Sequence, residues 1–191
     1  ELFFDDAIRA ADALDIALTK RGKHNGFDIP MCGVPVHASE TYLHRLIKKG
    51  FKVAVCEQTE TPIEAKKRGY KAVVNRKITR VVTPGTLTEE ALLDSRGQNF
   101  ILSIYKSLLG EYAIAWADIS DGSFNVSEVD SMNLPSKLAA LSPSEVIIPE
   151  LLYQDSEFLK TLHLRDTSLT PQPAIKFNYR SAEAHLKKCF N

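Results

Sequence analysis

The acidic residues near the middle of the sequence offer one possibility of catalysis. Asp118 lies in a predicted central strand, and Asp121, Glu128 and Asp130 follow it closely. A nuclease that uses two metal ions gathers several carboxylates around the scissile phosphate. Alternatively, Asp118 is a solvent-facing strand residue, Asp121 forms a turn with Gly122, and the other two close a strand. Both interpretations stay open, and the sequence favours the second because only one acid is well placed.

Other catalytic and metal-binding motifs are missing from the sequence. It has no glycine-rich loop ending in Gly-Lys-Ser/Thr and no Gly-x-Ser-x-Gly turn. Its five histidines and three cysteines lack the spacing of zinc ligands. The cysteines are odd in number and far apart, so we expect them to be reduced thiols. Cys56 is expected to be buried in an apolar strand. We therefore predict no catalytic residue, no metal site and no cofactor in this chain.

Basic residues are concentrated in the first half of the sequence. Residues 1–83 contain 15 Lys and Arg against 10 Asp and Glu, whereas residues 84–191 contain 9 against 14. Residues 65–80 contain no acid and seven bases: Lys66, Lys67, Arg68, Lys71, Arg76, Lys77 and Arg80. Such a patch can neutralise phosphates, although a solvated face of an ordinary domain can have the same composition.

A proline-containing segment up to residue 40 offers a different kind of contact. It reads KHNGFDIPMCGVPVHASE, and its prolines and glycines predict a long ordered loop, in which the part DIPMCGVPVHA exposes Met31. An apolar side chain on a stiff loop can press into a nucleic-acid groove or against a partner protein. Such loops also pack on their own domain, so both interpretations are open.

Helices and strands that could position these residues follow from the periodicity of residues 1–83. Apolar spacing predicts a helix from Asp5 to Leu18, ended by Gly22, and a second helix capped by Ser39. Strands are predicted over 51–58, 72–74 and 77–82, with a capping box at residues 61–64 between the first two. We interpret residues 1–83 as a small mixed α/β domain.

Residues 99–191 show a different order of elements. Three alternating strands with short turns precede a helix, a strand and a longer helix, over residues 99–107, 112–120, 123–129, 134–141, 144–149 and 150–162. An irregular segment and a helix over 181–190 follow. This order predicts an RNase H-like α/β fold. Residues 84–98 are polar and are interpreted as a linker. No apolar run approaches the roughly 18 residues of a membrane span, and no leader is visible.

Several ordered blocks of the sequence together resemble a known family. They read ELFFDDAIRAADALDIALTKRG, IPMCGVPVHASETYLHRLIKKGFKVAVCEQTETP and RKITRVVTPGTLTEEALL. These blocks resemble the mismatch-recognition domain and following linker of the MutS family of DNA mismatch-repair sensors. The resemblance is nearly continuous over residues 1–98. It is looser over 99–191, where ADISDGSFNVSE resembles the start of the family's connector domain.

The resemblance implies a domain organisation and a function. Residues 1–83 would be a mismatch-recognition domain lacking its start, 84–98 a linker, and 99–191 an RNase H-like connector cut short at its end. The expected function is recognition of mismatched double-stranded DNA in a bacterial, cytoplasmic, nucleoid-associated protein. The family's connector is a protein-contact module rather than a nuclease, and it meets MutL. The full-length protein would be a dimeric ATPase with its ATP and Mg sites downstream of this chain.

The resemblance also implies roles for individual residues. MutS proteins read mismatches with a Phe-x-Glu motif, and Glu1 matches its Glu, which puts the Phe two residues upstream of this sequence. The Phe acts as a wedge in the minor groove. Phe3 and Phe4 follow Glu1, so they are expected to pack the first helix onto the sheet instead.

Further DNA-contacting residues are implied less directly. By resemblance, Lys20 and Arg21 lie near phosphates and Met31 faces the mismatch. Arg76 and Lys77 belong to the basic patch, which is longer here than in compact family members and is expected to face DNA. Two rival hypotheses remain: a metal-dependent nuclease that uses Asp118, and a protein-interaction adapter that never touches DNA.

Overall fold

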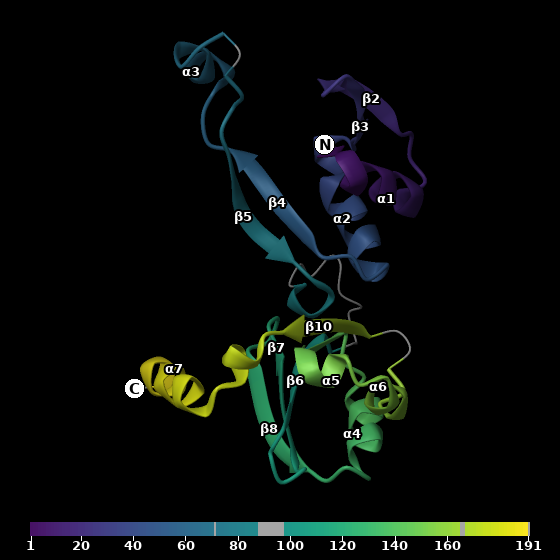
Figure 1. The fold of residues 1–191 in the computed structure, drawn as a ribbon, viewed down its shortest axis with the longest axis vertical. Helices are drawn as coiled ribbons and strands as arrows, with labels where there is room; N and C mark the ends of the chain where they lie inside the picture. Colours follow the sequence, from purple (N-terminus) through teal and green to yellow (C-terminus); the bar gives the residue numbers. More distant parts are fainter. Residues whose placement is uncertain (71, 88–97, 165–166, 191) are drawn as a thin grey trace. The chain divides into compact units, whose positions relative to one another are not determined.

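The computed structural model describes residues 1–70, 72–87, 98–164 and 167–190. The chain divides into two compact units, Glu1–Thr83 and Pro84–Asn191 (Figure 1). Most of the predicted linker lies outside the described residues. Residues 84–87 of the linker pack in the second unit, where the Asn99 side-chain amide donates hydrogen bonds to the carbonyls of Pro84 and Leu87 at 3.1 and 3.2 Å.

The first unit begins with a small antiparallel sheet and the helix that covers it. Strands β1 (Leu2–Phe3), β2 (Thr19–His24) and β3 (Phe27–Cys32) are ordered β1-β3-β2. Helix α1 (Phe4–Leu14) carries Asp5 and Asp6 in its first turn, where acids complement the helix dipole. Its alanine-rich face is buried with Leu14 and Cys32, because small side chains let the helix approach the sheet closely.

The β2–β3 hairpin corrects two sequence-based expectations. Helix α1 ends at Leu14 with Asp15 in a left-handed conformation, so the TKRG segment is strand and not helix. Residues 27–32 form β3 and not a loop. Asn25 and Gly26 between the strands both have positive φ, at 50° and 84°, as a tight hairpin turn requires. This Asn-Gly pair is a strong hairpin signal that the proline and glycine content of the neighbourhood obscured.

The second helix has the predicted position but a different start. A 3-10 turn, Val36–Ala38, leads into α2 (Ser39–Lys48). The Ser39 hydroxyl donates to the Val36 carbonyl at 2.7 Å instead of capping the helix. Leu43, Leu46 and Ile47 are buried, as the predicted periodicity requires.

A two-stranded antiparallel ribbon completes the first unit. It consists of β4 (Val53–Gln58) and β5 (Arg76–Val82), joined through the short helix α3 (Pro62–Lys67). The predicted capping box is present, with Thr61 and Glu64 bonded reciprocally. The predicted strand over residues 72–74 is not formed. Figure 1 shows α3 at the end of the ribbon where β4 ends and β5 begins.

The second unit contains a five-stranded mixed sheet. Its strands are β6 (Phe100–Lys106), β7 (Tyr112–Asp118), β8 (Ser123–Val129), β9 (Glu145–Pro149) and β10 (Ser168–Gln172). They are ordered β10-β9-β6-β7-β8, with β6, β7 and β8 antiparallel and with β9 parallel to both β6 and β10. This is the RNase H-like α/β arrangement predicted from the chain order. The segment of strand β10 was predicted to be irregular, because its own sequence contains a proline and its strand conformation depends on pairing with β9.

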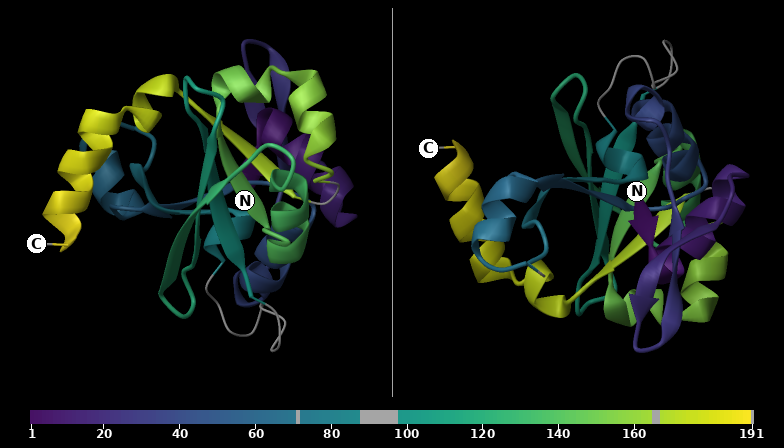
Figure 2. Two further views of the ribbon diagram at one scale, coloured as in Figure 1. Left: turned by 90° about the horizontal axis from the view of Figure 1, so that it is seen from below. Right: turned by 90° about the horizontal axis from the view of Figure 1, so that it is seen from above.

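Helices cover one face of this sheet. Helix α4 (Leu134–Leu141) buries Leu134 and Leu138 against Leu102, Ile104 and Ile114 of the sheet. The predicted helix over 150–162 is two helices, α5 (Glu150–Tyr153) and α6 (Ser156–Thr161), because Asp155 caps a new start. Figure 2 shows these helices grouped on one side of the sheet and α7 (Tyr179–Phe190), which follows the 3-10 turn Ala174–Phe177, standing apart from it. Within the described residues, none of the helices combines the length and apolar character that a membrane crossing requires.

Candidate nucleic-acid interface

The sheet β1-β3-β2 has one covered and one open face. Leu2 pairs with Cys32, and both pack in the core with α1. Phe3, Met31 and Thr19 are opposite one another across the three strands, so their side chains point to the other face. We call this the open face. Every residue of β2 is exposed to solvent, which makes the open face available to a ligand.

Glu1 and Arg21 form an ion pair at the edge of the open face. Glu1 is two residues before Phe3, and the strand period of two directs it to the same side. Its carboxylate accepts a hydrogen bond from Arg21 Nη1 at 2.5 Å. Both side chains are at least half exposed, so the pair contributes little to stability. The two residues are therefore available to a charged or hydrogen-bonding ligand.

Lys20 is engaged within the hairpin. Its Nζ is 2.7 Å from Oδ2 of Asp28 on β3. The hydrogen bond and the charge of Asp28 raise the pKa of the Lys20 ammonium, which stays protonated. A phosphate would have to compete with Asp28 for Lys20, whereas Lys23, farther along β2, has no ion pair with any residue of the described part of the chain. Lys23 was not among the predicted DNA-contacting residues, because its segment was interpreted as a loop.

Met31 lies in the central strand and not in an exposed loop, which corrects the loop prediction. It is half-buried between Phe3 and Thr19, and the Thr19 hydroxyl donates to the Met31 carbonyl at 2.8 Å. The expected placement of Phe3 and Phe4 is also wrong. Leu2 packs α1 onto the sheet, Phe3 lies on the open face, and Phe4 is exposed, with its ring edge-on to His24 at 6.2 Å. The open face thus carries two apolar side chains beside the Glu1–Arg21 pair.

Arg76 and Lys77 begin strand β5 on a different element of the first unit. Both are exposed, and they lie opposite Gln58 and Glu57 of β4. Arg76 Nη1 donates to the carbonyl of Val74 at 3.0 Å. The fold therefore separates the six predicted DNA-contacting residues into two groups, with Glu1, Lys20, Arg21 and Met31 on the small sheet and the other two on the ribbon.

The position of Asp118 argues against the nuclease hypothesis. The residue is only 3% exposed, so its predicted solvent-facing position is wrong. One carboxylate oxygen accepts the Asn99 N–H at 2.8 Å, and the other accepts the Ser120 N–H and hydroxyl at 2.9 and 2.6 Å. Burial raises the pKa of the Asp118 carboxyl, but these hydrogen bonds outweigh it and hold the pKa below its usual value. Asp118 is a structural acceptor that ties β7 to the start of β6.

No metal-binding cluster accompanies Asp118. Strand β6 contains no acid, and no group of three or more His, Cys, Asp or Glu side chains in the part of the chain that the structure describes could hold a metal ion.

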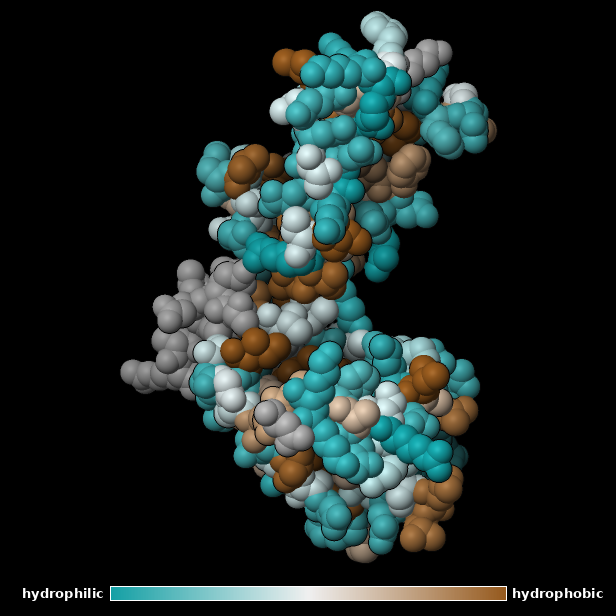
Figure 3. Space-filling model, turned by 90° about the vertical axis from the view of Figure 1, so that its left-hand side faces the viewer, coloured by the Kyte–Doolittle hydropathy of each residue, from teal (hydrophilic) through white to brown (hydrophobic). Residues whose placement is uncertain are grey.

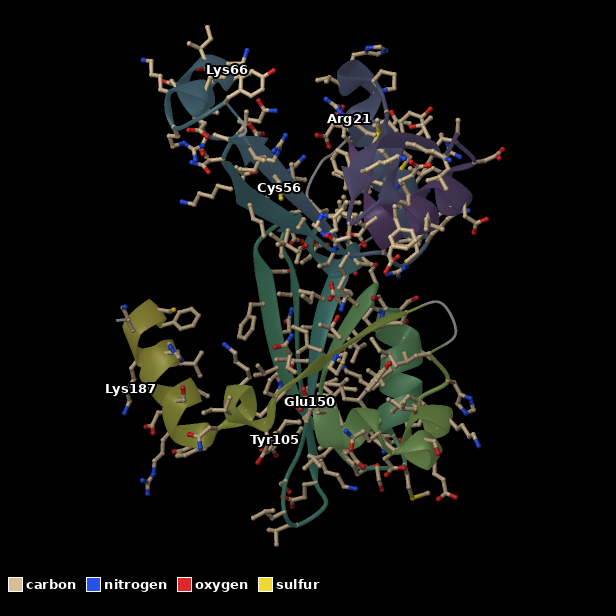
Figure 4. All side chains as sticks on the ribbon, turned by 45° about the horizontal axis from the view of Figure 1, so that its top comes forward. Arg21, Cys56, Lys66, Tyr105, Glu150 and Lys187 are labelled. Carbon is tan, nitrogen blue, oxygen red and sulfur yellow. The ribbon has the colours of Figure 1, made fainter. Side chains whose placement is uncertain are left out.

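The cysteines differ in environment. Cys32 is buried, and burial raises the pKa of its thiol. Cys56 is exposed on β4, so its predicted burial is wrong (Figure 4).

Both units are similar to parts of known proteins. The family model described as MutS domain I matches residues 1–91, and the model described as MutS domain II matches residues 99–191. The DNA mismatch repair protein MutS of Ruegeria pomeroyi is 55% identical over 187 residues, which cover 97% of this chain and 21% of that protein. MutS of a second Ruegeria species is 54% identical over 194 residues, covering 100% of this chain and 22% of that protein. The chain therefore spans about a fifth of the length of these relatives.

The likeness to a solved structure is weaker. A chain of the simian T-cell lymphotropic virus intasome in complex with PP2A regulatory subunit B56 gamma aligns with 50% of this chain and 43% of its own length. Its sequence identity is 20% and its TM-score 0.28, which is too low to support an argument about this protein.

Proposed function

The chain belongs to the MutS family, whose domain I and domain II models together match nearly all of it, and we propose that it binds mismatched duplex DNA for mismatch repair. The observation that carries this proposal is the open face, where Glu1 and Arg21 are paired beside the half-buried Phe3 and Met31. This arrangement offers a cation for a phosphate, an acceptor for a base, and apolar surface for a distorted groove.

The Glu1–Arg21 pair has a specific role in this proposal. A lone carboxylate near DNA is repelled by the phosphates, so a site that retains one needs compensation. Arg21 supplies this compensation in the free protein, because its guanidinium holds the Glu1 carboxylate. On binding, Arg21 turns to a phosphate and Glu1 accepts a hydrogen bond from an unstacked base. Glu1 then acts as a discriminator, because it disfavours DNA in which no unstacked base turns a donor toward the carboxylate.

Mismatch preference in this proposal comes from the deformability of the DNA. Inserting an aromatic wedge unstacks a base step and kinks the duplex, which costs a few kcal/mol in paired DNA and less where a mismatch has already weakened stacking. The family resemblance places that wedge two residues before Glu1. Met31 and Phe3 would line the same face and contact the widened groove.

The second unit has a different task in the longer protein. We propose that this RNase H-like unit connects the DNA-binding unit to the rest of a dimeric MutS and contacts MutL. Support comes from the match to MutS domain II and from the structural role of Asp118, whose oxygens are occupied by hydrogen bonds. ATP hydrolysis with Mg would be supplied by regions of the longer protein beyond this chain.

Duplex binding across a salt series tests the proposal. Matched and G·T-mismatched duplexes are titrated with the chain, with the variant Lys20→Gln/Arg21→Gln, and with an otherwise identical chain extended upstream through the native Phe. Each lost phosphate contact lowers the slope of log affinity against log salt by about 0.9, so the double variant should lose about 1.8 on both duplexes. Only the extended chain should prefer the mismatch.

A charge-matched control separates contact from net charge. Lys160→Gln/Lys188→Gln removes two exposed charges from α6 and α7 of the second unit and should leave the slope unchanged. If Lys20→Gln/Arg21→Gln also leaves the slope unchanged, the small sheet β1-β3-β2 is not the DNA-binding site. If neither the chain nor its extended form binds duplex at low salt, the adapter hypothesis replaces the proposal.

A further inference from the structure

The connection between β4 and β5 is a structured element rather than a plain turn. We call residues 59–70 and 72–75 the knob. The Thr59 N–H donates to the Asn75 carbonyl at 3.0 Å and closes its base. The capping box then starts α3: the Thr61 N–H donates to Glu64 Oε2 at 2.7 Å, and the Glu64 N–H donates to the Thr61 hydroxyl at 3.3 Å. These bonds fix the backbone at the base of the knob and at the start of α3.

The acids of the knob are used internally. The Glu60 side chain is only 16% exposed, and its carboxylate pairs with Arg68 and accepts the Asn75 N–H at 2.6 Å. Arg68 Nη2 also donates to the Val73 carbonyl at 3.0 Å, so this cation belongs to the framework of the knob. The carboxylate of Glu64 is held by Thr61, and these hydrogen bonds lower its pKa. Neither Glu60 nor Glu64 is positioned to neutralise the remaining cations.

Four cations remain at the surface of the knob and the adjoining start of β5. Lys66 and Lys67 lie in the last turn of α3, and Arg76 and Lys77 follow the knob. All four are exposed, and none forms an ion pair with another of the residues that the structure describes. Figure 3 shows a largely hydrophilic surface at this end of the first unit, with separate apolar side chains. Because these four side chains do not form intramolecular ion pairs, they are available to bind an anion.

We propose that the knob is a second DNA-contacting surface, which binds phosphates of the duplex away from the open face. The occupant is double-stranded DNA rather than an acidic protein, because the knob belongs to a unit already assigned to duplex DNA, and the inference rests on that proposed function. Figure 4 shows Lys66 and Arg21 at the same end of the first unit but on separate elements. Lysines on a short helix can contact the backbone without reading bases, so the knob adds affinity equally for matched and mismatched DNA.

Neutralising the two helix lysines tests this inference. The variant Lys66→Gln/Lys67→Gln keeps the capping box and the Glu60 contacts, so its circular dichroism and melting should match those of the unchanged chain. Two lost phosphate contacts should lower the salt slope by about 1.8 on both duplexes. Between 50 and 200 mM salt, the unchanged chain should therefore lose about 12-fold more affinity than the variant.

The outcomes separate this inference from the proposed function. A lower slope for Lys66→Gln/Lys67→Gln, an unchanged slope for Lys160→Gln/Lys188→Gln, and equal effects on the two duplexes support the knob as a backbone contact. If only Lys20→Gln/Arg21→Gln lowers the slope, the inference is overturned and the open-face proposal stands; the knob then serves another partner, such as an acidic protein. If the unchanged chain and its extended form bind no duplex, both proposals are overturned together.

Discussion

Replacing Asp118 by Asn should destabilise the second unit strongly without affecting DNA binding. The carboxylate is buried at the end of β7 and accepts three hydrogen bonds from Asn99 and Ser120. Asparagine keeps the shape but has only one acceptor oxygen. Its amide nitrogen must therefore face either the Asn99 N–H, which cannot accept a hydrogen bond, or Ser120, where the hydroxyl can accept one but the backbone N–H cannot.

The expected cost follows from which donors remain unsatisfied. A hydrogen bond to a charged group contributes about 1.5–3 kcal/mol, and a buried donor left without a partner costs about 1–3 kcal/mol. Ser120 is exposed, so water can replace its partner, but Asn99 is buried. The amide oxygen should therefore face the buried Asn99 N–H, and the net loss should correspond to about one hydrogen bond to a charged group, or about 1.5–3 kcal/mol of unfolding free energy.

The effect should also depend on pH. The pKa of Asp118 is lowered in the folded chain, so its ionised form stabilises the fold above the unfolded-state pKa of about 3.9. This stabilisation is lost as the pH falls through the lower, folded-state pKa. The difference in unfolding free energy between the unchanged chain and Asp118→Asn should be constant near neutral pH and shrink below about pH 4.

Urea unfolding followed by tryptophan fluorescence measures this effect in the second unit. Trp116, the single tryptophan of the chain, lies on β7 and packs against the core there. Glu128→Gln is the matched control, because it removes a carboxylate from the exposed strand β8 and should change the unfolding free energy by less than about 0.5 kcal/mol. Equal effects of the two variants would refute the structural role of Asp118. A metal-dependent nuclease activity that Asp118→Asn abolishes without destabilisation would restore the catalytic interpretation.

Two further changes test the open face and the packing of the second unit. In the upstream-extended chain, Glu1→Gln should raise the affinity for matched duplex a few-fold and reduce mismatch discrimination, because it removes a negative charge beside the phosphates. Asp12→Asn, which removes a carboxylate from α1, is the control. An equal rise in affinity for Asp12→Asn would show that net charge alone causes the effect. Gly85→Ala should destabilise the second unit by about 1–3 kcal/mol, since its Cβ would lie 2.8 and 2.9 Å from Cβ of Glu145 and Ile101; an unchanged urea midpoint would show that the site can relax.

The sequence predicted the features that depend on residues close together along the chain. The capping box at Thr61 was predicted because its parts lie within four residues, and the alternation in β6 and β7 was predicted because one side of each strand is buried. Errors arose where local signals competed. The apolar spacing that suggested a helix through Leu18 continues past Leu14, but the chain turns there through Asp15 to start the hairpin.

The sequence by itself determined the helical and strand periods, the turn and cap residues, the basic character of residues 65–80, and, through its ordered blocks, the resemblance to the MutS family. Only the tertiary structure decided which distant residues meet. Strand pairing brings Arg21 to Glu1, places Met31 in a central strand, and buries Asp118 beneath the Asn99 N–H. The physical reason is that backbone periodicity is set over a few residues, whereas burial and charge pairing depend on the register of strands far apart in the chain.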